Sequence, residues 1–198
     1  MSTDETTRTY ETQRKAAERN HAAILEAAHD LLASSPTASM NEIAKRAGVG
    51  AGTLYRHFPT REDLILAVYR HDMQKLADSV DELLTRESPL DAFLTWFETL
   101  AAYIRIKHGL DQALHSAAIS SAIDESYAPV AAAVARLLDA CVADGSVRPG
   151  LAADDVLLLM GFLWRLPPGD DGREQGRRIM QIVFNGILRR PERLRTSD

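Results

Sequence analysis

Four neighbouring polar residues carry the clearest chemistry in this sequence: Thr53, Tyr55, Arg56 and His57. The apolar residues Leu54 and Phe58 beside them have the spacing of the inner face of a short helix, which leaves the four polar side chains outside. Hydroxyl, guanidinium and imidazole groups suit phosphate oxygens and base edges. The pattern therefore indicates a nucleic-acid contact, although an ordinary helix pair with a polar outer face would read the same way.

Other groupings of reactive residues give less indication of a functional site. Glu18 and His21, like Glu26 and His29, have the Glu-x-x-His spacing of helical metal sites, but both pairs lie on one helix, where coincidence is the better interpretation. Cys141 is read as a small buried hydrophobe. No nucleophile, base and acid form a convincing set, so we expect no enzyme activity, no cofactor and no metal.

The sequence also offers candidate residues for a ligand-binding cavity. Several aromatic and imidazole residues stand among otherwise aliphatic helices, and around a cavity they could bind an amphipathic organic molecule. Core packing explains each one equally well. The candidates for this pocket are Trp96, Phe97, Tyr103, His108, His115, Tyr127 and Trp164.

Charge is divided unevenly along the chain. The 198 residues carry a net charge of −5, yet residues 8–61 carry a net +3 and residues 62–198 a net −6. A basic head on an acidic body indicates a polyanionic partner at one end. Apolar residues make up 45% of the chain, and it has one cysteine, which favours a globular fold and excludes a disulfide framework.

Membrane insertion and secretion are not expected. The longest apolar run, Val156 to Trp164, is about half of the ~18 residues that suggest a membrane span. The polar stretch from Met1 to Tyr10 lacks the apolar core of a signal peptide. We therefore expect a cytoplasmic protein.

Hydrophobic residues recur at three and four positions, which predicts an all-α fold of about nine helices. The helix from Ser39 opens with a capping box, Ser-Met-Asn-Glu, and is followed by a glycine-containing turn and a second short helix. Small residues at Ala44 and Gly48 allow the steep crossing of a helix-turn-helix over 39–58. A helix before this motif is expected to end at about Ser34. The helices after it are expected to span about 60–84, 88–108, 110–122, 126–143, 153–166 and 173–190.

These elements suggest four segments. Residues 1–13 are expected to be a mobile leader, 14–60 a three-helix DNA-binding domain, 61–84 a connecting helix, and 85–198 a ligand-binding and dimerisation domain. The last two helices are apolar on more sides than one chain can cover, which predicts a homodimer interface; the alternative is a monomer that buries them fully. The expected interface residues are Leu159, Phe162, Leu163, Ile179, Ile182, Val183 and Gly186.

The stretch Ala-Gly-Thr-Leu-Tyr-Arg-His-Phe-Pro-Thr-Arg-Glu-Asp-Leu-Ile, residues 51–65, resembles the signature of the TetR family of bacterial transcriptional regulators, and the likeness extends over about 20–84. The resemblance implies a homodimer whose heads bind a palindromic operator in double-stranded DNA and release it when a small-molecule effector binds. A repressor is expected. An activator with the same head, or a helical carrier or enzyme, remains an alternative.

The resemblance also assigns roles to single residues. It implies a base or methyl contact for Thr53 and phosphate contacts for Tyr55, His57 and Arg61. It places Met40 and Asn41 at the DNA backbone or an outer base. Ala51 and Gly52 depart from family members that read bases with longer side chains, so specificity is expected to depend on Thr53, Arg56 and DNA shape.

Overall fold

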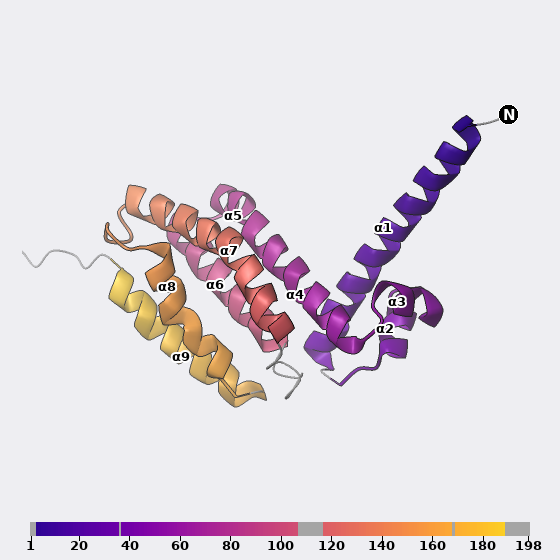
Figure 1. Ribbon diagram of the computed structural model, residues 1–198. Coiled ribbons are helices and arrows are strands. Elements are labelled where there is room, and N and C mark those ends of the chain that lie inside the picture. Colours follow the sequence, from indigo (N-terminus) through magenta and orange to yellow (C-terminus); the bar gives the residue numbers. More distant parts are fainter. Residues whose placement is uncertain (1–2, 36, 107–116, 168, 189–198) are drawn as a thin grey trace, which may run out of the picture. The chain divides into compact units, whose positions relative to one another are not determined.

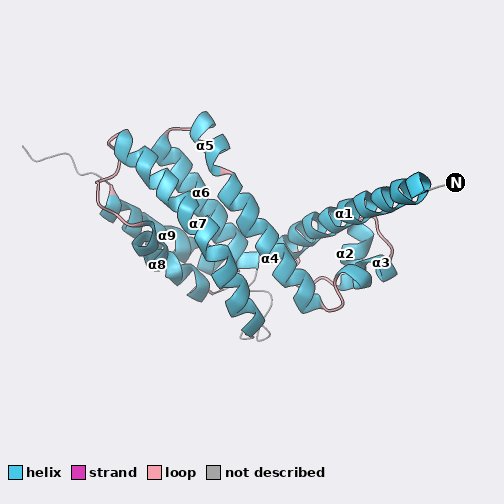
Figure 2. Cartoon of the chain, turned by 45° about the horizontal axis from the view of Figure 1, so that its top comes forward, coloured by secondary structure: helices cyan, strands magenta, loops and turns pink. Residues whose placement is uncertain are grey.

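The computed structural model describes residues 3–35, 37–106, 117–167 and 169–188 of the chain (Figure 1). This part is helical throughout, as expected, and it contains no strand, only an isolated bridge between Val147 and Leu188 (Figure 2). The helices are α1 (Thr3–Ser34), α2 (Met40–Arg46), α3 (Ala51–His57), α4 (Arg61–Asp78), α5 (Val80–Arg86), α6 (Pro89–Ile106), α7 (Ala117–Ala143), α8 (Ala153–Leu159), a 3₁₀ segment (Met160–Arg165) and α9 (Gly169–Ile187).

The chain divides into two compact units. The first comprises Met1–Asp72 with Ile106–Ile123, and the second comprises Met73–Arg105 with Asp124–Asp198. The boundary therefore falls inside α4, between Asp72 and Met73. This boundary lies within the predicted connecting segment 61–84, whose first turns share a core with α1, α2 and α3. The division into functional segments stays a prediction.

The core of the first unit joins α1, α2, α3 and the start of α4. Its buried side chains recur at helical spacing on each element and are Ile24, Leu25, Ala28, Leu32, Met40, Ile43, Ala44, Leu54, Phe58, Leu64, Ile65 and Val68. Burying this apolar surface, rather than intrinsic helix propensity, holds helices as short as α2 and α3 in place.

Local signals begin and end the short helices. The predicted capping box is present: the Ser39 hydroxyl accepts from the Glu42 backbone N–H at 3.3 Å, and the Glu42 carboxylate accepts from the Ser39 N–H at 2.7 Å. Thr60 and Asp63 repeat this arrangement ahead of α4. Gly48 has a φ of +69°, a left-handed conformation that favours glycine and turns the chain between α2 and α3.

The leader is helical in the structure. Helix α1 continues to Thr3 without interruption, and in Figures 1 and 2 its N-terminal part extends beyond α2 and α3. The described side chains from Glu11 to Arg19 are exposed, apart from half-buried Ala16. Mobility of residues 1–13 in the free protein stays a prediction, since no tertiary contact is needed to continue a helix that has already begun.

The second unit is built around buried aromatic residues. Phe93, Trp96 and Phe97 of α6 are fully buried, and Phe184 of α9 lies with its ring centroid 5.6 Å from that of Phe93. The Trp96 indole N–H donates to the Leu76 carbonyl at 2.8 Å. These contacts fasten α6 to the end of α4 and to α9, as expected for a central helix.

Two predicted helix boundaries are wrong. The helix expected over 60–84 is interrupted at Ser79, whose hydroxyl donates to the Leu76 carbonyl at 2.8 Å and so competes with the regular backbone pattern. The helices expected over 110–122 and 126–143 form one helix where they are described, because neither glycine nor proline stands at 123–125; Pro129 lies inside α7.

The C-terminal helices also differ from expectation. The stretch 153–166 changes from α8 to a tighter 3₁₀ segment at Met160, just before Gly161, a residue that weakens helices. Helix α9 begins at Gly169 rather than 173. Gly172 and Gly176 let it approach the preceding loop, since a Cβ on Gly172 would meet the Pro167 carbonyl oxygen at 1.8 Å and one on Gly176 would meet Leu166 at 2.7 Å.

One described helical stretch, Asp124–Ala143 of α7, is long and apolar enough to cross a membrane by length and composition alone. A core helix of a soluble protein has the same properties. Three residues of this stretch are fully buried within the second unit, to which the stretch belongs: Val134, Leu137 and Cys141.

Candidate nucleic-acid interface

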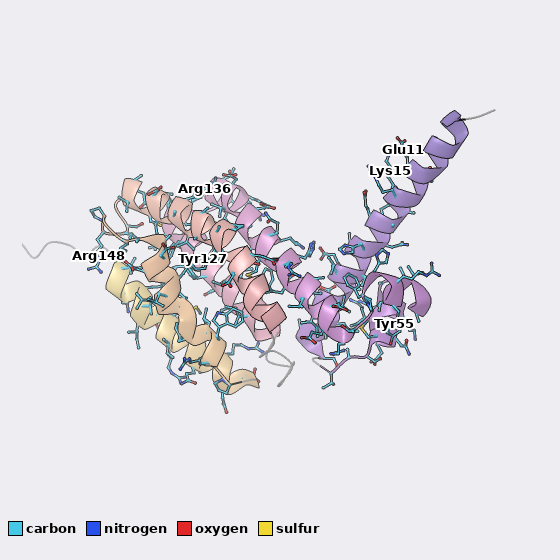
Figure 3. All side chains as sticks on the ribbon, in the orientation of Figure 1. Glu11, Lys15, Tyr55, Tyr127, Arg136 and Arg148 are labelled. Carbon is cyan, nitrogen blue, oxygen red and sulfur yellow. The ribbon has the colours of Figure 1, made fainter. Side chains whose placement is uncertain are left out.

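Helix α3 presents the predicted polar residues on its outer side. Leu54 is fully buried and Phe58 is 4% exposed, so these two residues fix the inner side of the helix. Tyr55 is 46% exposed (Figure 3). Arg56 is also exposed, whereas Thr53 and His57 are half-buried. The structure therefore brings all four residues together on one short helix, with a phenol and a guanidinium fully available to an anion.

The N-terminal end of α3 carries little side-chain chemistry. Ala51 and Gly52 are both exposed, and a Cβ added at Gly52 would have no atom within 4 Å. The space for a longer, base-reading side chain is thus present but unused. Direct readout from this end of the helix is limited to close approach of the backbone.

Met40 is not placed as the resemblance implied. Its side chain is 8% exposed and belongs to the core of the head, so any contact from this residue must come from its backbone. The cause is periodicity, because Met40 lies on the same face of α2 as Ile43 and Ala44. Asn41 is exposed beside it and keeps its expected availability.

Arg61 has a partner within the head. It is half-buried, and its guanidinium donates to the Ala38 carbonyl in the loop before α2. This contact fastens the first turn of α4 to the helix-turn-helix. A phosphate contact by Arg61 stays a prediction. To make it without loosening the head, the guanidinium would have to keep its hydrogen bond to the Ala38 carbonyl.

His57 belongs to a group of three rings that the sequence did not indicate. The His57 and His21 ring centroids lie 5.8 Å apart, and the His21 and Phe58 centroids lie 5.1 Å apart. Burial, with smaller contributions from His57 and His71, lowers the pKa of His21 below its ordinary value of 6.5. His21 is therefore uncharged at neutral pH beside the predicted phosphate contact.

The second Glu-x-x-His pair of α1, Glu26 and His29, bonds two residues of α4 rather than a shared metal. Glu26 accepts from His71 Nε2 at 3.0 Å, and His29 Nδ1 donates to the Asp72 carboxylate at 3.0 Å. Asp72 is 4% exposed, a buried carboxylate that its histidine partner compensates. These contacts pack α4 against α1. No cluster of three potential metal ligands occurs among the described residues.

Basic residues continue the positive head along α1. Lys15 is exposed (Figure 3), as are Arg14 and Arg19. Arg14 pairs with Glu18 at 3.3 Å, which cancels part of its charge. An exposed pair of this kind contributes about 0.3–0.5 kcal/mol and can exchange its partner for a phosphate.

The residues expected to line a ligand pocket do not converge on one described cavity. Trp96 and Phe97 are fully buried in the packed core. Tyr127 is 45% exposed and its hydroxyl donates to Asp154 at 2.9 Å, which raises the pKa of the phenol. Trp164 is 38% exposed and Tyr103 is half-buried. His108 and His115 lie outside the described residues.

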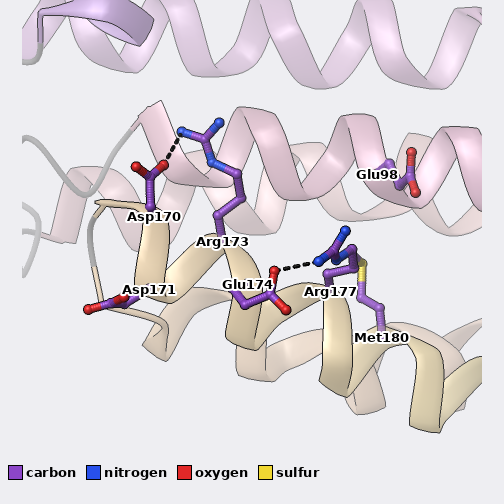
Figure 4. Close-up of a pocket in the computed structure, with 7 residues that line it drawn as sticks. All are labelled: Glu98, Asp170, Asp171, Arg173, Glu174, Arg177 and Met180. Atoms are coloured by element: carbon purple, nitrogen blue, oxygen red, sulfur yellow. Dashed lines mark hydrogen bonds and ion pairs between the residues drawn. The ribbon is translucent and has the colours of Figure 1, made fainter.

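The structure describes a different recess, between α6 and α9 (Figure 4). It encloses about 530 Å³ and has a mixed charged lining over a methionine: Glu98, Asp170, Asp171, Arg173, Glu174, Arg177 and Met180. Arg173 pairs with Asp170 at 3.3 Å, and Arg177 pairs with Glu174. Four carboxylates against two guanidinium groups favour a cationic molecule over an anion. No pattern in the sequence indicates this recess, because its residues are separated by some seventy positions.

The expected dimer residues fall into three groups by exposure. Leu159, Ile182 and Gly186 are exposed, with Leu159 at 55% and Ile182 at 70%, while Phe162, Ile179 and Val183 are half-buried. Leu163 is only 1% exposed, so its assignment to an interface is wrong; it packs in its own core. Leu158, at 80% exposed, was not among the predicted residues.

Two family profiles match the chain. "Bacterial regulatory proteins, tetR family" matches residues 24–68, and "Transcriptional regulator SbtR-like, C-terminal domain" matches residues 88–189. Among curated proteins, the HTH-type transcriptional repressor LfrR of Mycolicibacterium smegmatis is 40% identical over 79 residues, 40% of this chain and 42% of that protein. An HTH-type transcriptional regulator of Staphylococcus aureus is 45% identical over 62 residues, 30% of this chain and 34% of its own length. The match thus spans less than half of these relatives.

Solved structures extend the likeness to most of the chain. A TetR transcriptional regulator from Streptomyces coelicolor is 33% identical with a TM-score of 0.72, covering 86% of this chain and 99% of that one. A TetR regulatory protein from Mycobacterium vanbaalenii is 30% identical with a TM-score of 0.68, covering 89% and 99%. The helix-turn-helix and the helical second unit both agree with these relatives, and the protein is a DNA-binding regulator rather than an enzyme. The chain belongs to the TetR family of bacterial transcriptional regulators.

Proposed function

We propose that this protein is a cytoplasmic repressor that binds a palindromic operator as a homodimer and leaves it when a small molecule binds the second unit. The observation that carries the proposal is helix α3, which exposes Tyr55 and Arg56 while Leu54 and Phe58 anchor it in the head. A helix held in this way can enter the major groove without loss of the core that positions it.

Dimerisation is supported by apolar side chains left exposed on the second unit. Leu158, Leu159 and Ile182 are 80%, 55% and 70% exposed. Exposed apolar surface of this kind in a soluble protein marks an interface. A two-fold axis would bring the same surfaces of two chains together, and two-fold symmetry in the protein calls for a palindromic DNA site.

Repression is supported by one relative, LfrR of Mycolicibacterium smegmatis, which bears the name of a transcriptional repressor and is 40% identical over 79 residues. The recess between α6 and α9 offers an effector a place within the described residues. Its surplus of carboxylates favours an organic cation, and Met180 offers an apolar contact.

The proposal is tested by selecting DNA that binds the full chain from a random pool, then measuring transcription from a promoter that contains the selected site. We expect a palindrome whose half-sites lie about one helical turn apart or a multiple of it. Added protein should lower transcription. A site without two-fold symmetry would contradict the dimeric mode of binding, and increased transcription would identify an activator.

Removal of residues 1–13 should weaken DNA binding modestly and leave the fold intact. The deletion removes Arg8, so the slope of log affinity against log salt should fall by about 0.9 if this residue contacts one phosphate. Glu11 and Thr12, the deleted residues whose side chains are described, are both exposed, so the melting temperature should not change. Arg8→Gln in the full chain is the matched control and should reproduce the change in slope. A lower melting temperature after the deletion would show instead that the leader supports the fold.

A further inference from the structure

The three rings beside the recognition helix come from different parts of the head. His21 lies in α1, His57 is the last residue of α3, and Phe58 follows as its C-cap. The ring planes of His21 and His57 meet at 66°, an edge-to-face arrangement, and those of His21 and Phe58 meet at 37°. His21 thus touches both residues at the end of α3, although 36 positions separate it from His57 in the sequence.

The neighbouring rings restrict the orientation of the His57 side chain. Phe58 is 4% exposed and fixed in the core, its centroid is 6.2 Å from that of His57, and His21 is half-buried beside both rings. Edge-to-face contacts between rings have a preferred geometry and are worth more than the area they bury. A contact from α1 therefore limits the directions in which the His57 imidazole can point, while His57 itself stays half-buried and within reach of a ligand.

We propose that His21 is a positioning residue for the contact between His57 and a DNA phosphate: its ring holds the His57 imidazole in the orientation that the contact needs. The proposal rests on the proposed function, because it assumes that His57 meets phosphate. His21 itself touches no DNA in this account. It reduces the conformational freedom that His57 would otherwise lose on binding.

The charge of His21 gives the role a signature that simple packing lacks. The groups that act on His21 electrostatically are His57 of α3 and His71 of α4, and His71 is paired with Glu26 of α1. Burial and these two histidines lower the pKa of His21, so its charged form is disfavoured in the folded head. The head therefore loses stability as the pH falls below 6.5 toward the lowered pKa.

The disfavoured charge on His21 predicts a pH dependence of DNA binding. A proton taken up by His21 is unfavourable in its half-buried place beside the His57 and Phe58 rings, and so weakens the ring contact that holds His57. Affinity should therefore decline as the pH falls below 6.5 and His21 takes up its proton.

The experiment compares the full chain with His21→Ala, His21→Phe and His57→Ala, using a duplex of about 30 base pairs and arbitrary sequence at low salt, since phosphate contacts do not depend on sequence. Dissociation constants are measured from pH 5 to 8, and melting temperatures are recorded for each variant. At pH 7, His21→Ala should lose about two- to ten-fold in affinity. His21→Phe keeps a ring without a charge, so it should retain affinity at pH 8 and lose the decline at low pH.

The outcomes separate this inference from the function on which it rests. Weaker binding by His57→Ala together with unchanged affinity and pH profile in both His21 variants would overturn the positioning role. Unchanged binding by His57→Ala would rule out the phosphate contact and so overturn the positioning role, while DNA binding through Tyr55 and Arg56, and with it the proposed function, would stand. If His21→Ala fails to fold, the pH profile of His21→Phe decides alone, and a decline at low pH identical to that of the unmodified chain overturns the inference.

Discussion

Tyr55→Ala should lower the affinity for operator DNA by about ten- to one-hundred-fold without changing the melting temperature. The side chain is 46% exposed on the outer face of α3 and contributes nothing to the core of the head. A hydrogen bond from a phenol to a charged phosphate contributes about 1.5–3 kcal/mol, which corresponds to the stated loss. Gel-shift titration at one fixed salt concentration measures the affinity, and circular dichroism measures the melting.

The chain offers a matched control for this experiment. Tyr127 is 45% exposed, close to the value for Tyr55, but it belongs to the second unit and its hydroxyl bonds Asp154. Tyr127→Ala should therefore leave DNA binding unchanged. Tyr55→Phe separates the hydroxyl from the ring and should account for most of the loss. Equal affinity of Tyr55→Ala and the unmodified chain would show that α3 does not meet the DNA through this face.

The head was predictable because its signals are local. Ser39 and Glu42, three positions apart, indicate the start of a helix, and Gly48 adopts the left-handed conformation that ends it. Met40 has the spacing of Ile43 and is buried like it, so its side chain is not available to DNA, while a contact through its backbone stays a prediction. The contact of Arg61 with Ala38 joins residues 23 positions apart, and no pattern in one sequence reveals such a pairing.

The second unit was less predictable because its contacts link distant segments. Aromatic residues favour a core and a ligand cavity equally, and only the burial of Trp96 and Phe97, with Phe97 packed against Trp96 and Phe184, assigns these rings to the core. The structural roles of the glycines could not be told apart from the sequence either. Gly186 was expected to permit close approach, but Gly172 and Gly176 do so within the chain, and Gly186 is left open to a partner.

Ile182→Glu should convert the dimer to a monomer and abolish tight operator binding. Ile182 is 70% exposed on α9, and its other described neighbours in the expected interface, Leu159 and Gly186, are exposed as well. A carboxylate at this position would be buried twice at a two-fold interface, once from each chain, without a partner charge, whereas the monomer leaves it in water. The fold of one chain should therefore survive while association is lost.

The loss of DNA affinity should exceed the loss that any single contact explains. Two linked heads bind a palindrome with an advantage of about 10²–10⁴ over one head, and that advantage disappears when the chains separate. Gln181→Glu is the matched control, since it adds the same charge to the exposed neighbouring residue on α9 and should leave both dimer and affinity intact. Sedimentation measures the mass and gel-shift titration the affinity. An Ile182→Glu protein that stays dimeric and binds the operator tightly would place the interface on another surface, because a buried, unpaired carboxylate at Ile182 is incompatible with the one proposed here.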